Sequence, residues 1–256
     1  MSNLYQALGF PIGSEQELLD WIMRAAEHGD PVEAPGVDYL RWQAGGGVEL
    51  WVQVREDGGI VGVEPHLDGQ ARMRVALTAR IREDDAPAGQ GSLHGWADPS
   101  DEADPETGLY PFVFSVPDFR TCDGLALPAV KDVRLAALAY ELEAFPSEEA
   151  YLAGQSGELK YAPESFIPAG LFTTDPEGTP RPEAMFTGRV LQAERRVNTA
   201  SGGAFVWARV RTLGGEVEVA ADPAIVRGEV VPGGIVTGSF WMTGRIGAAM
   251  PAAQLH

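Results

Sequence analysis

The chain has 256 residues, of which 45% are hydrophobic and 9% aromatic, a composition typical of a packed globular protein and not of a disordered one. Its formal net charge of −18 at pH 7 opposes long-range attraction to nucleic acid and to anionic membranes. We find no apolar run of the roughly 18 residues that a membrane helix needs, so we expect no contact with a membrane. The first ten residues lack the basic and apolar segments of a signal peptide, and none is expected.

The cysteine and lysine contents indicate the compartment and the source. Cys122 is the single cysteine, so no intramolecular disulfide can form, which favours a reducing compartment. Only Lys131 and Lys160 are lysines among 19 basic residues, a skew that we interpret as the codon bias of a GC-rich genome. We therefore expect a bacterial protein of the cytoplasm.

The first predicted element is a helix over residues 15–28. Ser14 and Glu17 have the spacing of a capping box, and Gly29 follows as a stop. Apolar residues recur at helical spacing along it, and the face that carries Trp21 is expected to lie on a sheet.

From residue 37 onward the pattern indicates strands. We predict a first β-unit over 37–81, an acidic loop rich in Gly, Pro and Asp over 82–108, and further strands within 110–145. Together with the helix these segments form a predicted β-rich domain over residues 1–174. A short helix is predicted from Pro146 to Gly154.

An internal repeat links the two halves of the chain. Trp51–Val63 returns 156 positions later as Trp207–Val219, with seven of thirteen residues identical and no gap. Further on, Thr78–Ile81 is echoed by Thr243–Ile246. We predict that one β-unit is used twice, with Gly58-Gly59 and Gly214-Gly215 in equivalent hairpin turns.

The C-terminal part of the chain is predicted to form a second small β domain. Residues 175–184 carry several prolines and are predicted to be a linker. Residues 185–256 show four or five strands and one helical turn, an arrangement that resembles a small Greek-key barrel of the OB type. The predicted fold class is therefore mostly β with a few short helices: two related barrel units with an acidic insertion between them.

Aromatic and arginine side chains share one face of this C-terminal unit. The candidate binding face consists of Phe205, Trp207, Arg209, Arg211, Trp241 and Arg245, with Trp51 as the repeat partner of Trp207. Aromatic rings beside arginines suit single-stranded nucleic acid, in which bases stack and phosphates pair. The same residue types suit a protein interface. A tryptophan shared by both copies, beside arginines that are not shared, favours an inter-unit or subunit contact.

Catalytic and metal-binding patterns are weaker. His66 and Asp68, with the more distant His94 and Asp98, could bind a divalent ion if their loops met, but their spacing matches no common metal motif. Cys122 would need a basic neighbour to become a nucleophile. We therefore expect no cofactor, no metal and no catalytic residue.

The sequence favours a non-catalytic binding or assembly module of the cytoplasm, whose partner is another protein or a second copy. The alternative is an OB-like protein that binds single-stranded nucleic acid through the C-terminal unit. A third hypothesis is a metal-dependent hydrolase around His66, Asp68 and His94.

Overall fold

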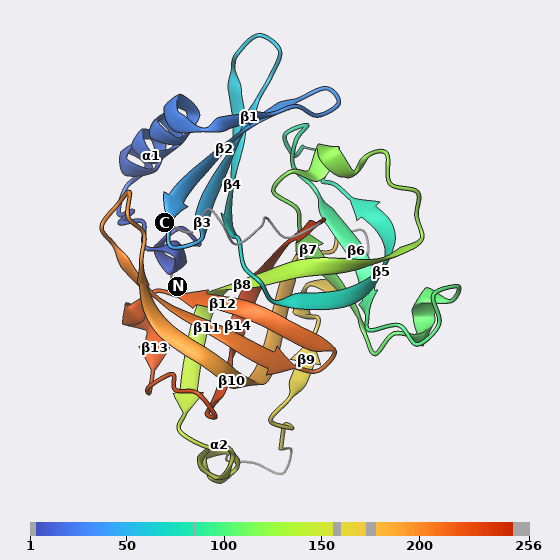
Figure 1. Cartoon of the computed structure of the whole chain (residues 1–256), viewed down its shortest axis with the longest axis vertical. Coiled ribbons are helices and arrows are strands. Elements are labelled where there is room, and N and C mark those ends of the chain that lie inside the picture. The colour runs from blue at the N-terminus through green and yellow to red at the C-terminus, as the bar shows by residue number, and fades with distance from the viewer. Residues whose placement is uncertain (1–3, 84, 156–159, 173–177, 248–256) are drawn as a thin grey trace.

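The computed structural model describes residues 4–83, 85–155, 160–172 and 178–247 (Figure 1). The described chain is mostly β, as predicted. Its helices are α1 (Glu15–His28) and α2 (Glu148–Gly154), with 3-10 turns η1 (Gln6–Leu8), η2 (Pro105–Thr107), η3 (Phe119–Cys122), η4 (Ala169–Leu171) and η5 (Pro223–Ile225). The first strands are β1 (Asp30–Val32), β2 (Asp38–Gly45), β3 (Val48–Val54), β4 (Ile60–Leu67), β5 (Arg72–Ile81), β6 (Ser92–Ala97) and β7 (Pro111–Ser115). They are followed by β8 (Ala129–Phe145), β9 (Ser165–Ile167), β10 (Glu183–Val197), β11 (Ala204–Thr212), β12 (Gly215–Ala221), β13 (Val226–Arg227) and β14 (Ile235–Ile246).

Helix α1 begins and ends where the sequence predicts. The Ser14 hydroxyl accepts a hydrogen bond from the Glu17 amide at 3.3 Å, and the Glu17 carboxylate accepts one from the Gly13 amide at 2.7 Å. Its inner face lies on β2 and β3, where Trp21 stacks on Trp42 with the ring centroids 6.3 Å apart. The predicted contact of the Trp21 face with a sheet is confirmed.

The strands form two sheets. Strands β1 to β4 make a four-stranded antiparallel sheet, which lies at the top of Figure 1 with α1 at its side. The other ten strands make a larger sheet, in which the long strands β8 and β14 pair with each other along almost their whole length.

Two sets of strands in the larger sheet share one pairing pattern. In the first, β5, β6 and β7 pair in chain order, β8 pairs back to β5, and Ser115 of β7 meets Thr243 of β14 in a parallel bridge. In the second, β10, β11 and β12 pair in chain order, β14 pairs back to β10, and β12 runs parallel to β8. Each set thus contributes one long strand that also pairs with the other set.

The predicted repeat holds for the hairpin strands around the tryptophans but not for the turns or for the units around them. Next to its turn, β3–β4 shifts register between Gln53 and Val54, whereas β11–β12 continues without a shift to Thr212 and Gly215. Trp51 pairs with Glu64 across β3–β4, and Trp207 pairs with Ala220 across β11–β12, which is the same register after the 156-residue shift. Gly58 and Gly214 both have positive φ, at 83° and 86°. However, β3 and β4 belong to the four-stranded sheet, whereas β5 lies in the larger sheet, so the predicted unit 37–81 is divided between two sheets. The pairings give the C-terminal strands a counterpart in β5–β8 instead.

The predicted acidic loop 82–108 also contains a strand, β6, which pairs with both β5 and β7. Because Ser92–Ala97 alternates half-buried and buried residues between two strands, its neighbours determine its conformation more than its Gly-rich surroundings do. Most of the predicted linker 175–184 lies outside the described residues or is irregular, but β10 already begins at Glu183.

Two large apolar clusters hold these layers together. One lies within the larger sheet and includes stacked rings such as Phe186 and Phe240, whose centroids are 4.0 Å apart. The other joins the N-terminal segment and the apolar face of the four-stranded sheet to β8, β11 and β12, and includes Phe10, Leu50 and Phe205. The four-stranded sheet is therefore packed firmly on the larger one.

Candidate binding crevice and the polar layer beside it

The two faces of the four-stranded sheet differ in character. Along β3, Leu50 and Val52 belong to the apolar cluster under α1. Glu49, Trp51 and Gln53 point to the opposite face, because side chains alternate along a strand. All three are at most 1% exposed, so this polar face is also covered.

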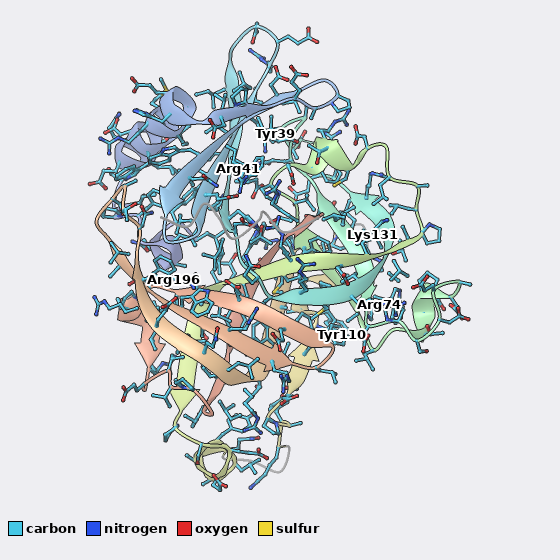
Figure 2. All side chains as sticks on the ribbon, in the orientation of Figure 1. Tyr39, Arg41, Arg74, Tyr110, Lys131 and Arg196 are labelled. Atoms are coloured by element: carbon cyan, nitrogen blue, oxygen red, sulfur yellow. The ribbon has the colours of Figure 1, made fainter. Side chains whose placement is uncertain are left out.

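The larger sheet and its loops provide that cover. The Tyr39 hydroxyl on β2 donates to the Gly89 carbonyl at 2.8 Å and accepts from the Arg120 amide at 3.0 Å. In Figure 2, Tyr39 and Arg41 mark this polar layer between the two sheets.

Arginines and carboxylates alternate within the layer. Arg41 bonds to the buried Glu49 carboxylate, which also accepts the Trp51 indole N–H at 2.8 Å. Asp68 pairs with both Arg41 and Arg134. Burial raises the pKa of Glu49, and the hydrogen bonds and charge of Arg41 oppose that rise.

Arg245 of β14 extends this network. Its guanidinium donates to Asp118 at 2.8 and 3.1 Å and lies over the Trp51 ring, 4.5 Å from the centroid. The layer therefore joins the sheets through paired charges and a cation–π contact.

His66 is enclosed in the same layer. It is 1% exposed, its Nδ1 lies 3.0 Å from the Thr243 hydroxyl, and its Nε2 has no hydrogen-bond partner among the described residues. Burial lowers the pKa of His66 well below its ordinary value, and the charges of Arg245, Arg134 and Arg41 lower it further. The ring is therefore neutral at pH 7.

The structure does not bring the predicted metal ligands together. His66 faces Thr243, Asp68 faces two arginines, and His94 of β6 faces the Thr78 hydroxyl at 2.6 Å. Within the described part of the chain, no group of three His, Cys, Asp or Glu side chains is placed to hold a metal ion. The third hypothesis, a metal-dependent hydrolase, loses its proposed centre.

Glu64 lies two residues before His66 on the same side of β4 and opens to a crevice. The carboxylate is half-buried and has no hydrogen-bond or ion-pair partner among the described residues. Burial raises the pKa of Glu64 to about 7, so the fold disfavours its ionised form. An unneutralised carboxylate in a concave site is the type of group that marks a functional site.

The crevice has a volume of about 110 Å³ and is formed by both sheets and two loops. Trp241 and Ser115 form part of its wall, and the Trp241 indole N–H donates to the Ser115 hydroxyl at 3.0 Å, which fixes the plane of the ring. The other lining residues are Ile81, Arg82, Glu83, Ala86, Gln90, Gly91, Ser92, Thr179, Pro180 and Pro182.

A larger groove of about 630 Å³ runs between α1 and the β3–β4 hairpin. Its apolar floor includes Leu40 and Ile60, and its charged lining residues, such as Asp20 and Arg24, are exposed on α1. Because those charges are solvated and none is buried against an apolar wall, the Glu64 crevice is the stronger candidate site.

The candidate aromatic and arginine face is not an open platform. Phe205 and Trp207 are 0% and 5% exposed, under the N-terminal segment, and Arg196 covers the Trp207 ring at 3.7 Å from its centroid. Arg209 and Arg211 both lie within ion-pair distance of Glu216. Arg245 belongs to the polar layer, and only Trp241 reaches the crevice.

Both tryptophans of the repeat are buried, and each gives its indole N–H to a buried glutamate. Trp207 donates to Glu218 at 2.7 Å, and the other Glu218 oxygen accepts the Gln70 and Ala71 amides. Trp51 uses Glu49 in the same way. The two tryptophan–glutamate bonds are local, within β3 and across the β11–β12 hairpin, whereas the amides of Gln70 and Ala71 tie Glu218 to a distant segment.

Cys122 shows no sign of activation. The side chain is buried, and burial with the nearby Asp118 charge raises the pKa of its thiol to about 11. A thiol with so high a pKa is a poor nucleophile at neutral pH.

Of the residues around the crevice, the sequence pointed to Trp241 on the candidate binding face but gave no role to Glu64. Glu64 lies two residues before His66, which the sequence analysis singled out. A lone glutamate after the apolar residues of β4 is the signal that could have marked it. Ser115 carries no such signal, because the pairing of β7 with β14 brings it near. Gln90, in the segment between β5 and β6, carries none either.

No protein-family model, curated protein or solved structure matches this chain. None of the described helices is both long and apolar enough to cross a bilayer.

Proposed function

We propose that this protein is a non-catalytic binding module and that the crevice at Glu64 is its ligand site. The observation that carries the proposal is the Glu64 carboxylate, which is half-buried and faces the crevice without a described partner. Its raised pKa means that folding disfavours its charged form. Proteins tend to keep such unfavourable groups where function needs them.

Binding is favoured over catalysis by the state of the nearby reactive groups. The Ser115 hydroxyl already accepts from Trp241 and donates to the Met242 carbonyl at 3.3 Å. His66 is enclosed, neutral and engaged with Thr243. Neither group is placed as a base or nucleophile beside Glu64.

The ligand group is small. Pockets for drug-sized molecules measure about 300–1,000 Å³, whereas this crevice measures about 110 Å³. A side-chain-sized group is therefore the expected occupant.

Nuclear magnetic resonance of the tryptophan indole N–H signals tests this proposal. Trp241 lines the crevice, and a Trp241→Phe variant assigns its signal. In a screen of small anionic, neutral and cationic fragments, we expect at least one fragment to shift that signal. Ala86→Phe, which fills the crevice wall, should abolish the shift. Ala88→Phe, on an exposed site of the same loop that does not line the crevice, should preserve it.

If no fragment moves the Trp241 signal, or if Ala86→Phe leaves the shift intact, the crevice is not the ligand site. Recovery of the ligand unchanged after prolonged incubation is expected, and its conversion to a product would contradict the non-catalytic role.

We also infer that the larger sheet consists of two OB-like units that share β8 and β14. The inference is supported by the cyclic pairing of five strands in each set, β5–β6–β7–β14–β8 and β10–β11–β12–β8–β14. In chain order, the 3-10 turn η3 precedes β8 after the first three strands, and η5 precedes β13 and β14 after the second three. Small five-stranded Greek-key barrels of the OB type close in this manner.

Hydrogen exchange tests this architecture. Val217 and Val219 pair with Val210 and Ala208 of β11, whereas the amides of Glu218 and Ala220 point to the other side, toward β8. A closed unit should therefore protect the amides of Glu218 and Ala220 as strongly as those of Val217 and Val219. An open sheet would leave the Glu218 and Ala220 amides in fast exchange. Single-stranded nucleic-acid binding gains no support, because Phe205 and Trp207 are buried.

A further inference from the structure

We propose that the group bound in the Glu64 crevice is a small organic cation, either a guanidinium or an alkylammonium group, held between the Glu64 carboxylate and the Trp241 ring. This inference rests on the proposed binding function of the crevice and specifies the class of its ligand.

The charges of the lining residues favour a cation. Glu64 and Glu83 contribute two carboxylates, and Arg82 contributes one guanidinium. Arg82 and Glu83 are exposed to solvent, whereas Glu64 is half-buried and lacks a described ion-pair partner. An anionic ligand would lie against an unneutralised carboxylate, whereas a cation would supply its missing partner.

Trp241 provides the second recognition element. This protein already places arginines over tryptophan rings: Arg245 over Trp51 at 4.5 Å, Arg196 over Trp207 at 3.7 Å and Arg24 over Trp21 at 5.2 Å. None of the described cations covers Trp241, although its ring lines the crevice beside a carboxylate. A ligand cation there would reproduce a contact that the chain uses elsewhere.

The affinity should depend on pH, because only ionised Glu64 pairs with a cation. The pKa of Glu64 is raised to about 7, so its ionised fraction rises about tenfold from pH 6 to pH 8. The charged and titratable groups around it are Arg82 and Glu83 in the crevice wall, Tyr5, whose pKa the Glu64 charge helps to raise, and neutral His66. Alkylguanidinium and alkylammonium ions stay protonated across this range, so the change reports on the protein.

The test uses n-propylguanidinium and n-propylammonium, with uncharged n-propylurea and anionic propionate as matched probes. Dissociation constants are measured from the Trp241 indole shift at pH 6 and pH 8. We expect the cations to bind, with an affinity about tenfold higher at pH 8 than at pH 6. Glu64→Gln should weaken binding at least about tenfold and remove the pH dependence. Glu83→Gln, which removes a charge from the same crevice, should change the affinity by less than about threefold.

One further probe, N-acetylarginine amide, identifies the source of the cation. Tighter binding of N-acetylarginine amide than of n-propylguanidinium supports a side chain of a partner polypeptide. The reverse order supports a free small molecule. Either order of affinities agrees with an organic cation as the ligand.

The outcomes separate this inference from the proposed function. Equal shifts from n-propylurea or propionate, retained in Glu64→Gln, would overturn the cation and leave the crevice as a binding site. The absence of any shift from all probes and from the wider fragment screen would overturn both. Circular dichroism of Glu64→Gln confirms that the variant is folded.

Discussion

Two neighbouring side chains of β4 show how burial acts on opposite kinds of charge. Burial disfavours the charged form of any group, so it raises the pKa of Glu64 and lowers that of His66. Both groups are therefore driven toward neutrality, and they change the stability of the fold with pH in opposite directions. A single substitution of each residue therefore measures its own contribution to the pH dependence of stability.

For His66, the unfolded chain binds a proton below its ordinary pKa of about 6.5, whereas the folded state does not. His66 therefore does not reduce the stability of the fold above that pH, and it reduces the stability progressively as the pH falls below it. We expect wild-type protein to lose about 1.4 kcal/mol per pH unit relative to His66→Asn between pH 6 and pH 5. Urea unfolding across this range measures the difference.

The exposed His28, substituted in the same way, is the control and should leave the wild-type pH dependence unchanged. A wild-type slope in His66→Asn would show that the buried ring is protonated in the fold.

For Glu64 the sign is reversed. Its folded pKa of about 7 exceeds the ordinary value of 4.5, so the folded state holds the proton more tightly, and this stabilisation is lost as the pH rises toward 7. We expect Glu64→Gln to gain stability over wild type from pH 5 to pH 7.5, by no more than about 1.4 kcal/mol per unit. A variant that is less stable than wild type at pH 8 would mean that a partner stabilises the Glu64 charge.

At the level of elements, the hairpins β3–β4 and β11–β12 share a register around the tryptophans and a left-handed glycine, but they have different surroundings. An added Cβ at Gly58 would meet nothing within 4 Å, whereas at Gly214 it would lie 3.0 Å from the Tyr110 hydroxyl oxygen and 3.1 Å from Ala97 Cβ. The repeat in the sequence therefore encodes the turn, and the tertiary contacts differ between the copies.

We expect Gly58→Ala to cost about 1–2 kcal/mol, because a residue with a Cβ is strained at positive φ. Gly214→Ala should cost more, since the same strain is combined with the close contacts to Tyr110 and Ala97. Gly124→Ala, which has open space and no positive φ, is the control and should be nearly neutral. Equal losses at Gly58 and Gly214 in chemical unfolding would contradict this account.

For the whole molecule, the four-stranded sheet is attached to the larger sheet on both of its faces. An apolar cluster joins them on the side of α1, and the polar layer joins them on the other face. In that layer, Arg245 and Asp118 have side chains only 16% and 9% exposed, so each charge depends on the other. A buried ion pair is costly to break from one side, because the remaining charge stays buried.

Arg245→Met should therefore destabilise the protein by about 3–5 kcal/mol, and the double variant Arg245→Met with Asp118→Asn should lose less than the single variant. Arg211→Met removes a half-exposed partner of Glu216 and should cost at most about 1 kcal/mol. Thermal or urea unfolding of these variants and of Asp118→Asn gives the four values. A double variant that loses the sum of the two single variants would show that Arg245 does not act through Asp118.

The sequence by itself determined the local features of this protein. The spacing around Ser14 predicted the start of α1, alternation predicted most of the strands, and paired glycines predicted the two matching hairpins. These features depend on residues a few positions apart, and their physics is contained in short segments.

Only the tertiary structure decided how those segments combine. It placed β3–β4 and β11–β12 in different sheets, turned Ser92–Ala97 into a strand, and brought Glu64, Ser115 and Trp241 to one crevice. Phe205 and Trp207 alternate with small residues as a surface strand would, yet the N-terminal segment covers them. Strand pairing over a hundred residues of separation depends on the packing of whole faces, which no short pattern in the chain specifies.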